Sequence, residues 1–363
     1  MSVITGAPWL LAHKSMLQVN QPLKVTLYDR DYVIWKDRQE QISILPNACP
    51  HLGAMLSEGW VEEDLTDRSC RVVCPYHALK FDRDGCTVLP GSQKKTLPQL
   101  KPPKLIIQGD FIWSYGEHEP QMPIPTVLNE IAANYDFIGH TADVSEEIDL
   151  KTMLLNMHDY NHQTGAHHEP MKIKEVRLEK FVDRGFESEA VFHNQMESKT
   201  FADKLKNPTL FFMPEALTTH LENFFPNLVI IHTNNAFGKA AQCHLFVPET
   251  ATRTRIYVLL FAQPKMKFVK YLNNFGKKKF LDLAKVVVDQ DVDILLKVYP
   301  DFSQKIQLNN EVGMRWIDRN FANFPIVAQP NYSTRSRSRF RPEMEIKSVL
   351  TETKSQSVKQ KLR

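Results

Sequence analysis

The hydrophobic and polar positions of the first third of the chain follow a period of two over short stretches. Leu23, Val25 and Leu27 alternate with polar neighbours, and compact apolar runs follow at short intervals with Gly and Pro between them. Short runs of this kind, bounded by turn residues, are typical of β-strands. The pattern therefore predicts a small all-β domain over residues 1–118. Its expected strands lie at 23–27, 32–35, 42–45, 71–73, 87–89, 104–107 and 111–113.

The pattern changes after this domain. Residues 116–125 are polar and contain three prolines, which is typical of a linker, and we place the linker at residues 119–133. Residues 134–330 then mix runs typical of strands with helical periodicity, which predicts an antiparallel sheet flanked by helices. The expected fold class is therefore α+β. The clearest strands lie at 227–233, 241–247 and 255–263, and the clearest helix at 279–299.

One carboxylate lies on the apolar side of that helix. Asp291 occupies the middle of the stripe, whereas Asp289 and Asp293 lie about 200° around the helix from it. A buried carboxylate is costly unless it is paired with a cation or bound to a metal. We therefore expect Asp291 to be a metal ligand, with pairing to a buried Arg or Lys as the alternative. The apolar stripe consists of Ala284, Val287, Val288, Ile294, Leu295 and Val298.

The composition is that of an ordinary globular protein. The chain has 363 residues, enough for two domains, with 42% hydrophobic and 24% charged residues. Its five cysteines are few and odd in number, which favours a reducing compartment. The N-terminus lacks the pattern of a signal peptide, and no apolar run reaches the ~18 residues of a membrane span. We expect a cytoplasmic protein without a membrane span.

Charge is distributed unevenly along the chain. Residues 331–363 carry nine Lys or Arg and three Glu, whereas the preceding 330 residues carry 36 basic and 39 acidic side chains. A basic tail can bind nucleic acid, an anionic membrane or an acidic redox partner. A solvated, weakly ordered or disordered terminus is the simpler interpretation, because the segment has no core periodicity. We expect no nucleic-acid partner.

Two cysteine–histidine pairs mark the first domain. Cys49 precedes His51 by two positions, and Cys74 precedes His77 by three. A Rieske-type [2Fe–2S] centre takes two Cys on one iron and two His on the other, so two such loops can hold it from both sides. A Cys2His2 zinc site uses the same residue types, but zinc fingers usually group the cysteines together and the histidines together. The order favours the iron–sulfur centre, with the cysteines on the inner iron and the histidines on the outer one.

A histidine-rich segment marks the second domain. Asn156, Asp159 and His162 are three residues apart, so on a helix they would share one face. Gly165 would then allow the chain to turn and bring His167 back toward His162. Two histidines and one carboxylate on one side of a metal form the facial triad of non-haem Fe(II) oxygenases. A surface loop with satisfied histidines is the alternative, and the iron–sulfur motif upstream favours the metal.

With both motifs in view, the chain resembles the Rieske non-haem iron oxygenases. The loops read C-x-H and C-x2-H, although Ala78-Leu79 stands where the family usually has Gly-Trp. The second segment matches the family pattern N-x2-D-x2-H-x4-H in full. The matches extend from about residue 8 to about residue 325, and the size resembles the smaller, homotrimeric branch with phthalate dioxygenase and vanillate demethylase.

The resemblance implies a role for each matched residue. His162 and His167 would bind mononuclear iron, with His168 as a competitor for the second position, and the Gln290-Asp291 context matches the iron-binding Asp of the family. Asp159 would be the carboxylate that bridges to a cluster histidine of the neighbouring subunit. Asn156 completes the matched catalytic segment.

The resemblance also implies the activity. The chain would be an oxygenase component that inserts oxygen from O2 into a small organic substrate by hydroxylation or oxidative demethylation. Because the sequence has no dinucleotide-binding G-x-G-x-x-G, electrons would come from a separate ferredoxin or flavin-dependent NAD(P)H reductase. The alternatives are an aromatic cis-dihydroxylating dioxygenase and a pure Rieske electron-transfer protein. Residues that would line the substrate pocket, unless they belong to the core, are Phe211, Phe212, His220, Asn223, Phe224, Phe225, His232 and Tyr257.

Overall fold

A computed structural model of the protein describes most of the chain before the basic tail. Residues Met1–Val327 form one compact unit, and the expected tail at 331–363 lies outside the described residues. No helix in the described part is long and apolar enough to cross a membrane. The described residues are 2–63, 69–87, 89, 95–141, 144–206, 215–235, 238–264, 274–299, 304–324 and 326–328.

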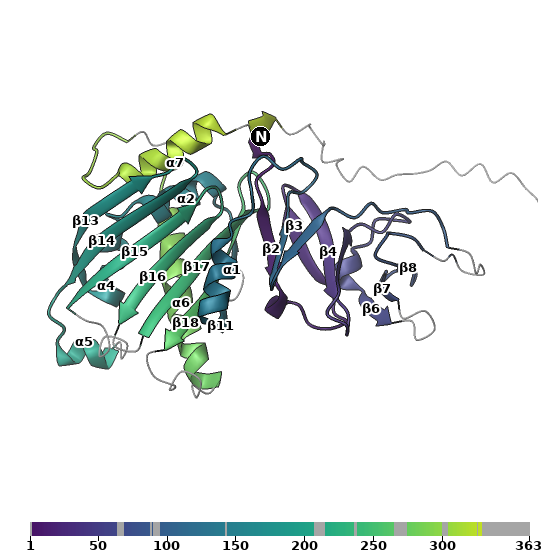
Figure 1. The fold of residues 1–363 in the computed structure, drawn as a ribbon, viewed down its shortest axis with the longest axis horizontal. Coiled ribbons are helices and arrows are strands. Elements are labelled where there is room, and N and C mark those ends of the chain that lie inside the picture. Colours follow the sequence, from purple (N-terminus) through teal and green to yellow (C-terminus); the bar gives the residue numbers. More distant parts are fainter. Residues whose placement is uncertain are drawn as a thin grey trace, which may run out of the picture. The chain divides into compact units, whose positions relative to one another are not determined.

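The first part of the chain is built from three small antiparallel sheets (Figure 1). Their strand orders are β2-β10-β9, β3-β4-β5 and β6-β7-β8. Short strands with tight turns follow from the short alternating runs of the sequence, as predicted. The strands are β1 (Ser2–Ile4), β2 (Trp9–His13), β3 (Leu23–Leu27), β4 (Arg30–Lys36), β5 (Ile42–Pro46), β6 (Trp60–Glu63), β7 (Cys70–Val73), β8 (Lys80–Phe81), β9 (Leu105–Gln108) and β10 (Phe111–Ser114), with short 3-10 helices at Lys14–Met16 and Leu56–Glu58.

Two hydrophobic clusters divide this part. The β3-β4-β5 and β6-β7-β8 sheets enclose a small cluster around Trp35 and Phe81, and Cys49 and Cys74 belong to it. The β2 strand instead joins the large core, because Trp9 and Leu10 pack with the buried residues of the second part. The two cysteine–histidine loops are thus anchored in the small cluster through their cysteines.

The second part is dominated by an eight-stranded antiparallel sheet. Its main path runs β11-β18-β17-β16-β15-β14-β13, and β12 pairs with β18. The pairing between β16, β17 and β18 has no register shift, so alternate residues face opposite sides across all three strands. The eight strands are β11 (Asp136–His140), β12 (Val144–Glu146), β13 (Ile173–Asp183), β14 (Glu187–Met196), β15 (Ala216–Phe224), β16 (Leu228–Asn235), β17 (Gly238–Pro248) and β18 (Thr254–Pro264); the short strand β19 (Ile326–Ala328) lies outside this sheet.

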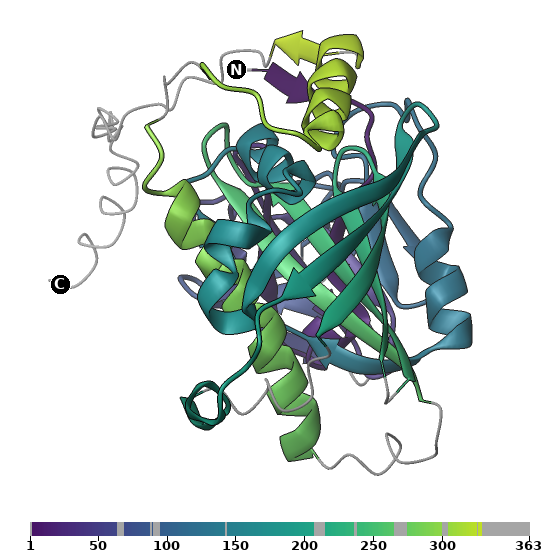
Figure 2. The ribbon, with the colours of Figure 1, turned by 90° about the vertical axis from the view of Figure 1, so that its left-hand side faces the viewer.

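Helices cover one face of this sheet. The long helix α6 contacts β11 and β18, and α2 contacts α6, α7 and β17. Figure 2 shows α6 running beside the sheet, with the short helices that precede β13 next to it. This packing places α2, α3 and α6 together over the same part of the sheet. The helices are α1 (Val127–Asn134), α2 (Leu150–His158), α3 (Gln163–Ala166), α4 (His168–Met171), α5 (Phe201–Lys206), α6 (Asn274–Leu295) and α7 (Val312–Asn323).

The predicted architecture is confirmed: an N-terminal β part and an antiparallel sheet flanked by helices. The helix expected at 279–299 begins earlier and ends at Leu295. Ile294, in the last turn of α6, and Val298, beyond its end, were predicted to be on the apolar stripe but are exposed. Ala284, Val288 and Asp291 are buried as the stripe predicts. Of the strand expected at 87–89, Thr87 makes one bridge to Phe81, and Val88 lies outside the described residues.

Candidate functional site

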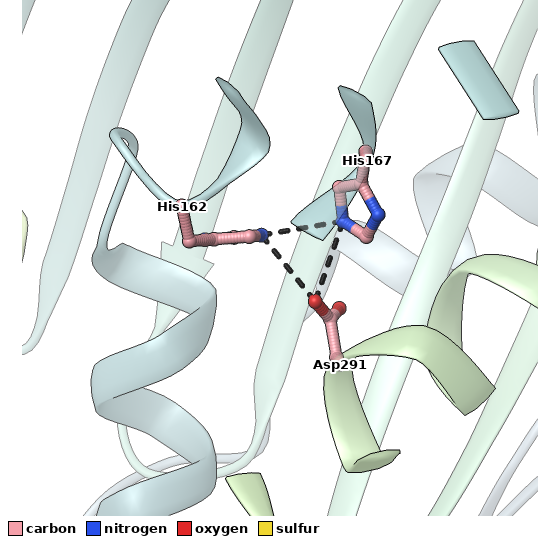
Figure 3. A group of neighbouring side chains, drawn as sticks. All are labelled: His162, His167 and Asp291. Atoms are coloured by element: carbon pink, nitrogen blue, oxygen red, sulfur yellow. Dashed lines mark hydrogen bonds and ion pairs between the residues drawn. The ribbon is translucent and has the colours of Figure 1, made fainter. Parts of the chain in front are cut away.

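Three side chains from separate elements meet between the helices and the sheet (Figure 3). The Nε2 atoms of His162 and His167 are 3.3 Å apart, and Oδ1 of Asp291 lies 3.4 Å and 3.3 Å from them. Within the described residues, this is the one group of three or more potential ligand atoms that lie within 4.8 Å of one another. The structure thus brings together three residues that the sequence singled out from positions 129 residues apart.

The outer ring nitrogens of both histidines are held by oxygen atoms. Nδ1 of His162 contacts the backbone oxygen of Asp159, and Nδ1 of His167 lies 3.0 Å from Oε1 of Gln290. Because these oxygens only accept hydrogen bonds, each Nδ1 carries the proton and donates it. Each Nε2 therefore presents its lone pair to the centre of the group, which is the arrangement of metal-binding histidines.

The Asp291 carboxylate has the properties of a metal ligand. Its Oδ1 is buried and accepts no hydrogen bond from the described residues. Burial would raise the pKa of Asp291, but His167 and His162 outweigh it and hold the pKa below its usual value. Two ligand atoms about 2.1 Å from an ion that subtend roughly 90–110° at it are about 3.0–3.4 Å apart. The observed separations of 3.3–3.4 Å fit one ion bound by all three atoms.

Gln290 orients His167, and its removal is expected to weaken metal binding. In Gln290→Leu, Nδ1 of His167 would lose its acceptor, so the ring could rotate or shift its proton to Nε2. Loss of such an outer hydrogen bond typically reduces metal affinity about 10- to 100-fold. Titration of iron-free protein with Fe(II) measures the change. Gln290→Glu keeps an acceptor and should bind at least as tightly as the wild type; equal affinity in all three proteins would contradict the role.

The local route of the chain differs from the predicted one. We expected Asn156, Asp159 and His162 on one face of a helix, but α2 ends at His158 and Asp159 is extended, with φ −84° and ψ 91°. His162 reaches the site because α3 starts directly after it. Gly165 lies within α3, so the return of His167 comes from consecutive short helices and not from a glycine turn.

The two predicted catalytic residues lie beside His162, His167 and Asp291, which we call the metal group. Asn156 acts on Asp291 as one of the smaller influences that lower its pKa, yet its Nδ2 is buried and completes no hydrogen bond with the described residues. The amide thus approaches the carboxylate without bonding to it. The half-buried Asp159 carboxylate accepts the backbone N–H of Asn161 at 3.0 Å, and its backbone oxygen holds His162.

The other histidines of the segment have different partners. His158 is buried, donates from Nδ1 to the backbone oxygen of Leu154 at 2.7 Å and stacks on Trp316. Burial lowers the pKa of His158 to about 4. His168, predicted as a competitor of His167, contacts the backbone oxygen of Ile173 through Nδ1 at 3.2 Å. Neither belongs to the metal group.

The three carboxylates of the last two turns of α6 are separated as the apolar stripe predicts. Asp291 is buried, while Asp289 and Asp293 are exposed. The exposed pair forms ion pairs one turn away, Asp289 with Lys285 and Asp293 with Lys297. No buried Arg or Lys approaches Asp291 within 4.0 Å among the described residues, since its ion-pair partners there are the two histidines.

The two cysteine–histidine loops share one backbone design. Cys49 and Cys74 each accept a hydrogen bond from the N–H four residues on, at 2.8 and 3.0 Å, and each donates to the oxygen five residues on. The fourth residue, Gly53 in one loop and Ala78 in the other, has a left-handed φ of 78° and 54°. Both cysteines are buried, whereas the two histidines are exposed, with their Nδ1 atoms 3.1 Å apart.

These four side chains form two pairs and not one tetrahedral group. The histidines approach each other through Nδ1. The pKa of Cys49 is raised by burial and then by the neighbouring Cys74 thiol, so the sulfurs are also close. In the described part of the chain no three of these ligand atoms come within 4.8 Å of one another. A single zinc ion needs all four close together, whereas two irons need one pair each.

Ala78 holds a conformation that favours glycine, so Ala78→Gly is expected to stabilise the protein. A left-handed residue other than Gly costs about 1–2 kcal/mol, of which the greater flexibility of unfolded Gly offsets part. The net gain is on the order of 0.5–1 kcal/mol. Gly53→Ala is the matched control, since an added Cβ there meets no atom within 4 Å and only the backbone resists it. Thermal unfolding should rise for Ala78→Gly and fall for Gly53→Ala; equal shifts would refute the explanation.

Several residues expected in the pocket lie elsewhere. Tyr257 donates to the backbone oxygen of Leu10 at 2.7 Å, and His220 and His232 pair with Glu189 and Glu222. All face the side of the sheet away from α6, because strand residues alternate and the register places them there. Phe225 belongs to an aromatic core cluster with Phe186, Trp316, Phe321 and Phe324, Asn223 faces the helices, and Phe211 and Phe212 lie outside the described residues.

Two residues near the metal group escaped the sequence analysis. Gln290 holds His167, and only its place beside Asp291 pointed to it. His244 of β17 is buried, and both its ring nitrogens lack a partner among the described residues. A lone histidine within an apolar strand carries no signal of its own in sequence, so the fold was needed to place it.

Comparison with known proteins supports the first domain directly. Residues 8–101 match the family described as the Rieske [2Fe-2S] domain. Aminopyrrolnitrin oxygenase PrnD of Pseudomonas fluorescens is 26% identical over 184 residues, 48% of this chain and 49% of the relative. A vanillate O-demethylase oxygenase subunit of Pseudomonas sp. is 25% identical and covers 46% of each chain. The chain spans about half the length of the curated relatives it matches.

Solved structures resemble the whole fold. Dicamba monooxygenase bound to dicamba has a TM-score of 0.66 at 15% identity, over 89% of this chain and 98% of that one. NdmA of Pseudomonas putida CBB5 with caffeine has a TM-score of 0.59 at 14% identity, over 90% and 97% of the two chains. The likeness shows that the arrangement of both parts is shared.

Proposed function

We propose, from the premise that this chain belongs to the Rieske non-haem iron oxygenases of the smaller type, that it is an oxygenase component acting on a small organic substrate. The observation that carries the proposal is the meeting of His162, His167 and Asp291 in a chain that also has a Rieske domain. An electron carrier would need the Rieske domain alone.

In this proposal the cysteine–histidine loops hold the [2Fe–2S] cluster. Cys49 and Cys74 bind the inner iron, because they are buried side by side in the small hydrophobic cluster. His51 and His77 bind the outer iron through Nδ1, because these atoms face each other at the exposed tip of the loops. Neutral imidazole in place of charged thiolate raises the reduction potential of the cluster, which suits it to deliver electrons.

The second centre is assigned to a single Fe(II). Two histidines and one carboxylate leave the opposite positions of the ion open, as in the facial triad of non-haem iron enzymes. When bound, the cluster supplies single electrons and the iron supplies the place where O2 is activated. The protein fixes the ligand geometry through Gln290 and the backbone oxygen of Asp159, and it keeps the carboxylate buried.

Asp159 is assigned the electron route between centres. Its backbone oxygen already holds an iron-ligand histidine, and its half-buried carboxylate bonds to the N–H of Asn161. The exposure of His51 and His77 lets them approach a neighbouring subunit. We assign the assembly as a homotrimer in which the cluster of one subunit serves the iron of the next through this carboxylate.

The partners follow from the chemistry. Electrons come from a separate ferredoxin or flavin-dependent NAD(P)H reductase, and O2 is the second substrate. The relatives are named as an oxygenase, a demethylase, a desaturase and monooxygenases, which supports oxidation of an organic molecule without fixing the reaction type. We favour hydroxylation or oxidative demethylation over cis-dihydroxylation, because the chain resembles the smaller branch of the family, which includes vanillate demethylase.

An O2-uptake screen tests the proposal. The purified protein, supplied with NADH and a surrogate ferredoxin and reductase, should consume O2 faster with one or more members of a panel of aromatic, methoxylated, N-methylated and sterol compounds. Isotopically labelled O2 should place one labelled atom in a hydroxylated product and two in a cis-dihydrodiol, whereas oxidative demethylation releases the inserted atom with formaldehyde. A protein with both metal centres filled that never couples O2 uptake to an oxidised or demethylated product would contradict it.

A further inference from the structure

His244 lies on the face of the large sheet that meets α6, the helix that carries Asp291. It belongs to β17, is 3% exposed, and neither Nδ1 nor Nε2 has a hydrogen-bond partner among the described residues. Asp291 acts on the pKa of His244, opposing the effect of burial, so the imidazole lies within electrostatic reach of the metal-binding carboxylate. A buried polar group left unpaired costs about 1–3 kcal/mol, so a hydrogen-bond partner for His244 would stabilise the protein.

The sheet register fixes which way His244 points. His244 pairs with Val229 on β16 and with Val258 on β18. The next residues on β17 and β18, Leu245 and Tyr257, face the opposite side, where the Tyr257 hydroxyl bonds to the backbone of Leu10. His244 therefore faces α6, with an apolar residue on each side across the strands.

The described part of the sheet face around His244 is apolar and carries no cation. The flanking Val229 and Val258 are buried, and further along the same face lie Leu221, Ile231 and Leu260. At the positions of the described β14–β18 strands that face α6, no Lys or Arg occurs. Burial lowers the pKa of His244 to about 4, so its ring is neutral and offers one N–H and one lone pair.

We propose that His244 binds the polar group of the substrate, and that this substrate is a largely apolar molecule with one uncharged oxygen function such as a carbonyl or hydroxyl. This assignment rests on the proposed oxygenase function and adds the substrate class. The imidazole N–H donates to the oxygen, while the valines and leucines of the sheet contact the apolar body. The carbon that reacts is thereby held beside the iron-binding group.

Three probes of one shape test the assignment. Indane, 1-indanone and indane-1-carboxylate differ only in the polar function, and equilibrium dialysis against the anaerobic holoenzyme measures the uptake of each. The wild type should prefer 1-indanone over indane by about tenfold, as expected for one buried hydrogen bond, and over the carboxylate as well. His244→Phe should reduce the preference over indane to about onefold. His244→Gln, which retains a donor, should preserve part of it.

His232→Phe is the matched control, because it makes the same change on the neighbouring strand but on the opposite face. The preference of His232→Phe for 1-indanone over indane should equal that of the wild type. A wild type that takes up indane and 1-indanone equally, takes up neither, or prefers the carboxylate overturns the assignment, as does an unchanged preference in His244→Phe.

Iron and labile sulfide measured on the same samples separate the two failures. A wild type with both centres filled but without the preference refutes the role of His244 alone. A wild type that cannot hold the mononuclear iron refutes the proposed function and the His244 assignment with it. Retained cluster absorption in His244→Phe and His244→Gln shows that the variants are folded.

Discussion

Asp291→Ala is expected to lose the mononuclear iron and all product formation while retaining the cluster. Oδ1 of Asp291 lies 3.3–3.4 Å from both histidine Nε2 atoms, so the variant removes one of three ligands. The cluster loops rest on a separate hydrophobic cluster, which the substitution does not reach. Visible absorption at full strength, with iron reduced by about one atom per chain, is the expected result.

Asp289→Ala and Asp293→Ala are the controls on the same helix. Both carboxylates are exposed and pair with lysines one turn away, so their loss should change stability by less than about 0.5 kcal/mol. Both variants should keep the iron and the activity. If either loses the iron while Asp291→Ala retains it, the assignment of the third ligand is wrong.

Asp159→Asn is expected to keep both metal centres and to slow electron transfer between them by a factor on the order of 10². The isosteric amide preserves the backbone oxygen that holds His162, so the iron site should remain intact. It removes the negative charge that we assign to the contact with the cluster histidine of the neighbouring subunit. Single-turnover reoxidation of the reduced cluster by O2 with substrate present measures the rate.

Asp293→Asn provides the comparison for Asp159→Asn, since it removes one exposed carboxylate outside the metal group. Its reoxidation rate should match that of the wild type. Unchanged reoxidation in Asp159→Asn, with iron and cluster both present, would show that electrons reach the iron by another route.

The parts of the fold that local pattern determines were predictable. The apolar runs 241–247 and 255–263 predicted β17 and β18, because strands that are buried on both faces give nearly continuous apolar runs. The apolar stripe of α6 predicted the burial of Asp291. The same pattern failed at Ile294, which is exposed although it lies within α6, and at Val298, since nothing in the apolar spacing marks where the helix ends.

The metal group was predictable in its residues but not in its route. Spacing alone made a helix through Asn156, Asp159 and His162 plausible, yet α2 ends at His158 and the backbone oxygen of Asp159 turns to His162 instead. That contact depends on the ring position, which packing against α6 determines. The contact between Asp159 and His162 therefore could not be predicted from the local sequence.

Residues that act through tertiary neighbours lay beyond the sequence. His220 and His232 looked like pocket residues because they are aromatic and polar, but the register turns them to the other face. His244 comes within electrostatic reach of Asp291 for the same reason. Its position in the register is offset from that of His232 by an odd number of residues, so its side chain faces the helices. Which face of the sheet meets the helices is a property of the assembled fold.

Iron and acid-labile sulfide counted together on one preparation test the central claim that a single chain carries a Rieske cluster and a mononuclear iron. The account predicts about three irons and about two sulfides per chain in the wild type, and about two of each in Asp291→Ala. Cys74→Ser should lose the sulfide. Stoichiometric zinc without labile sulfide in the wild type would contradict it.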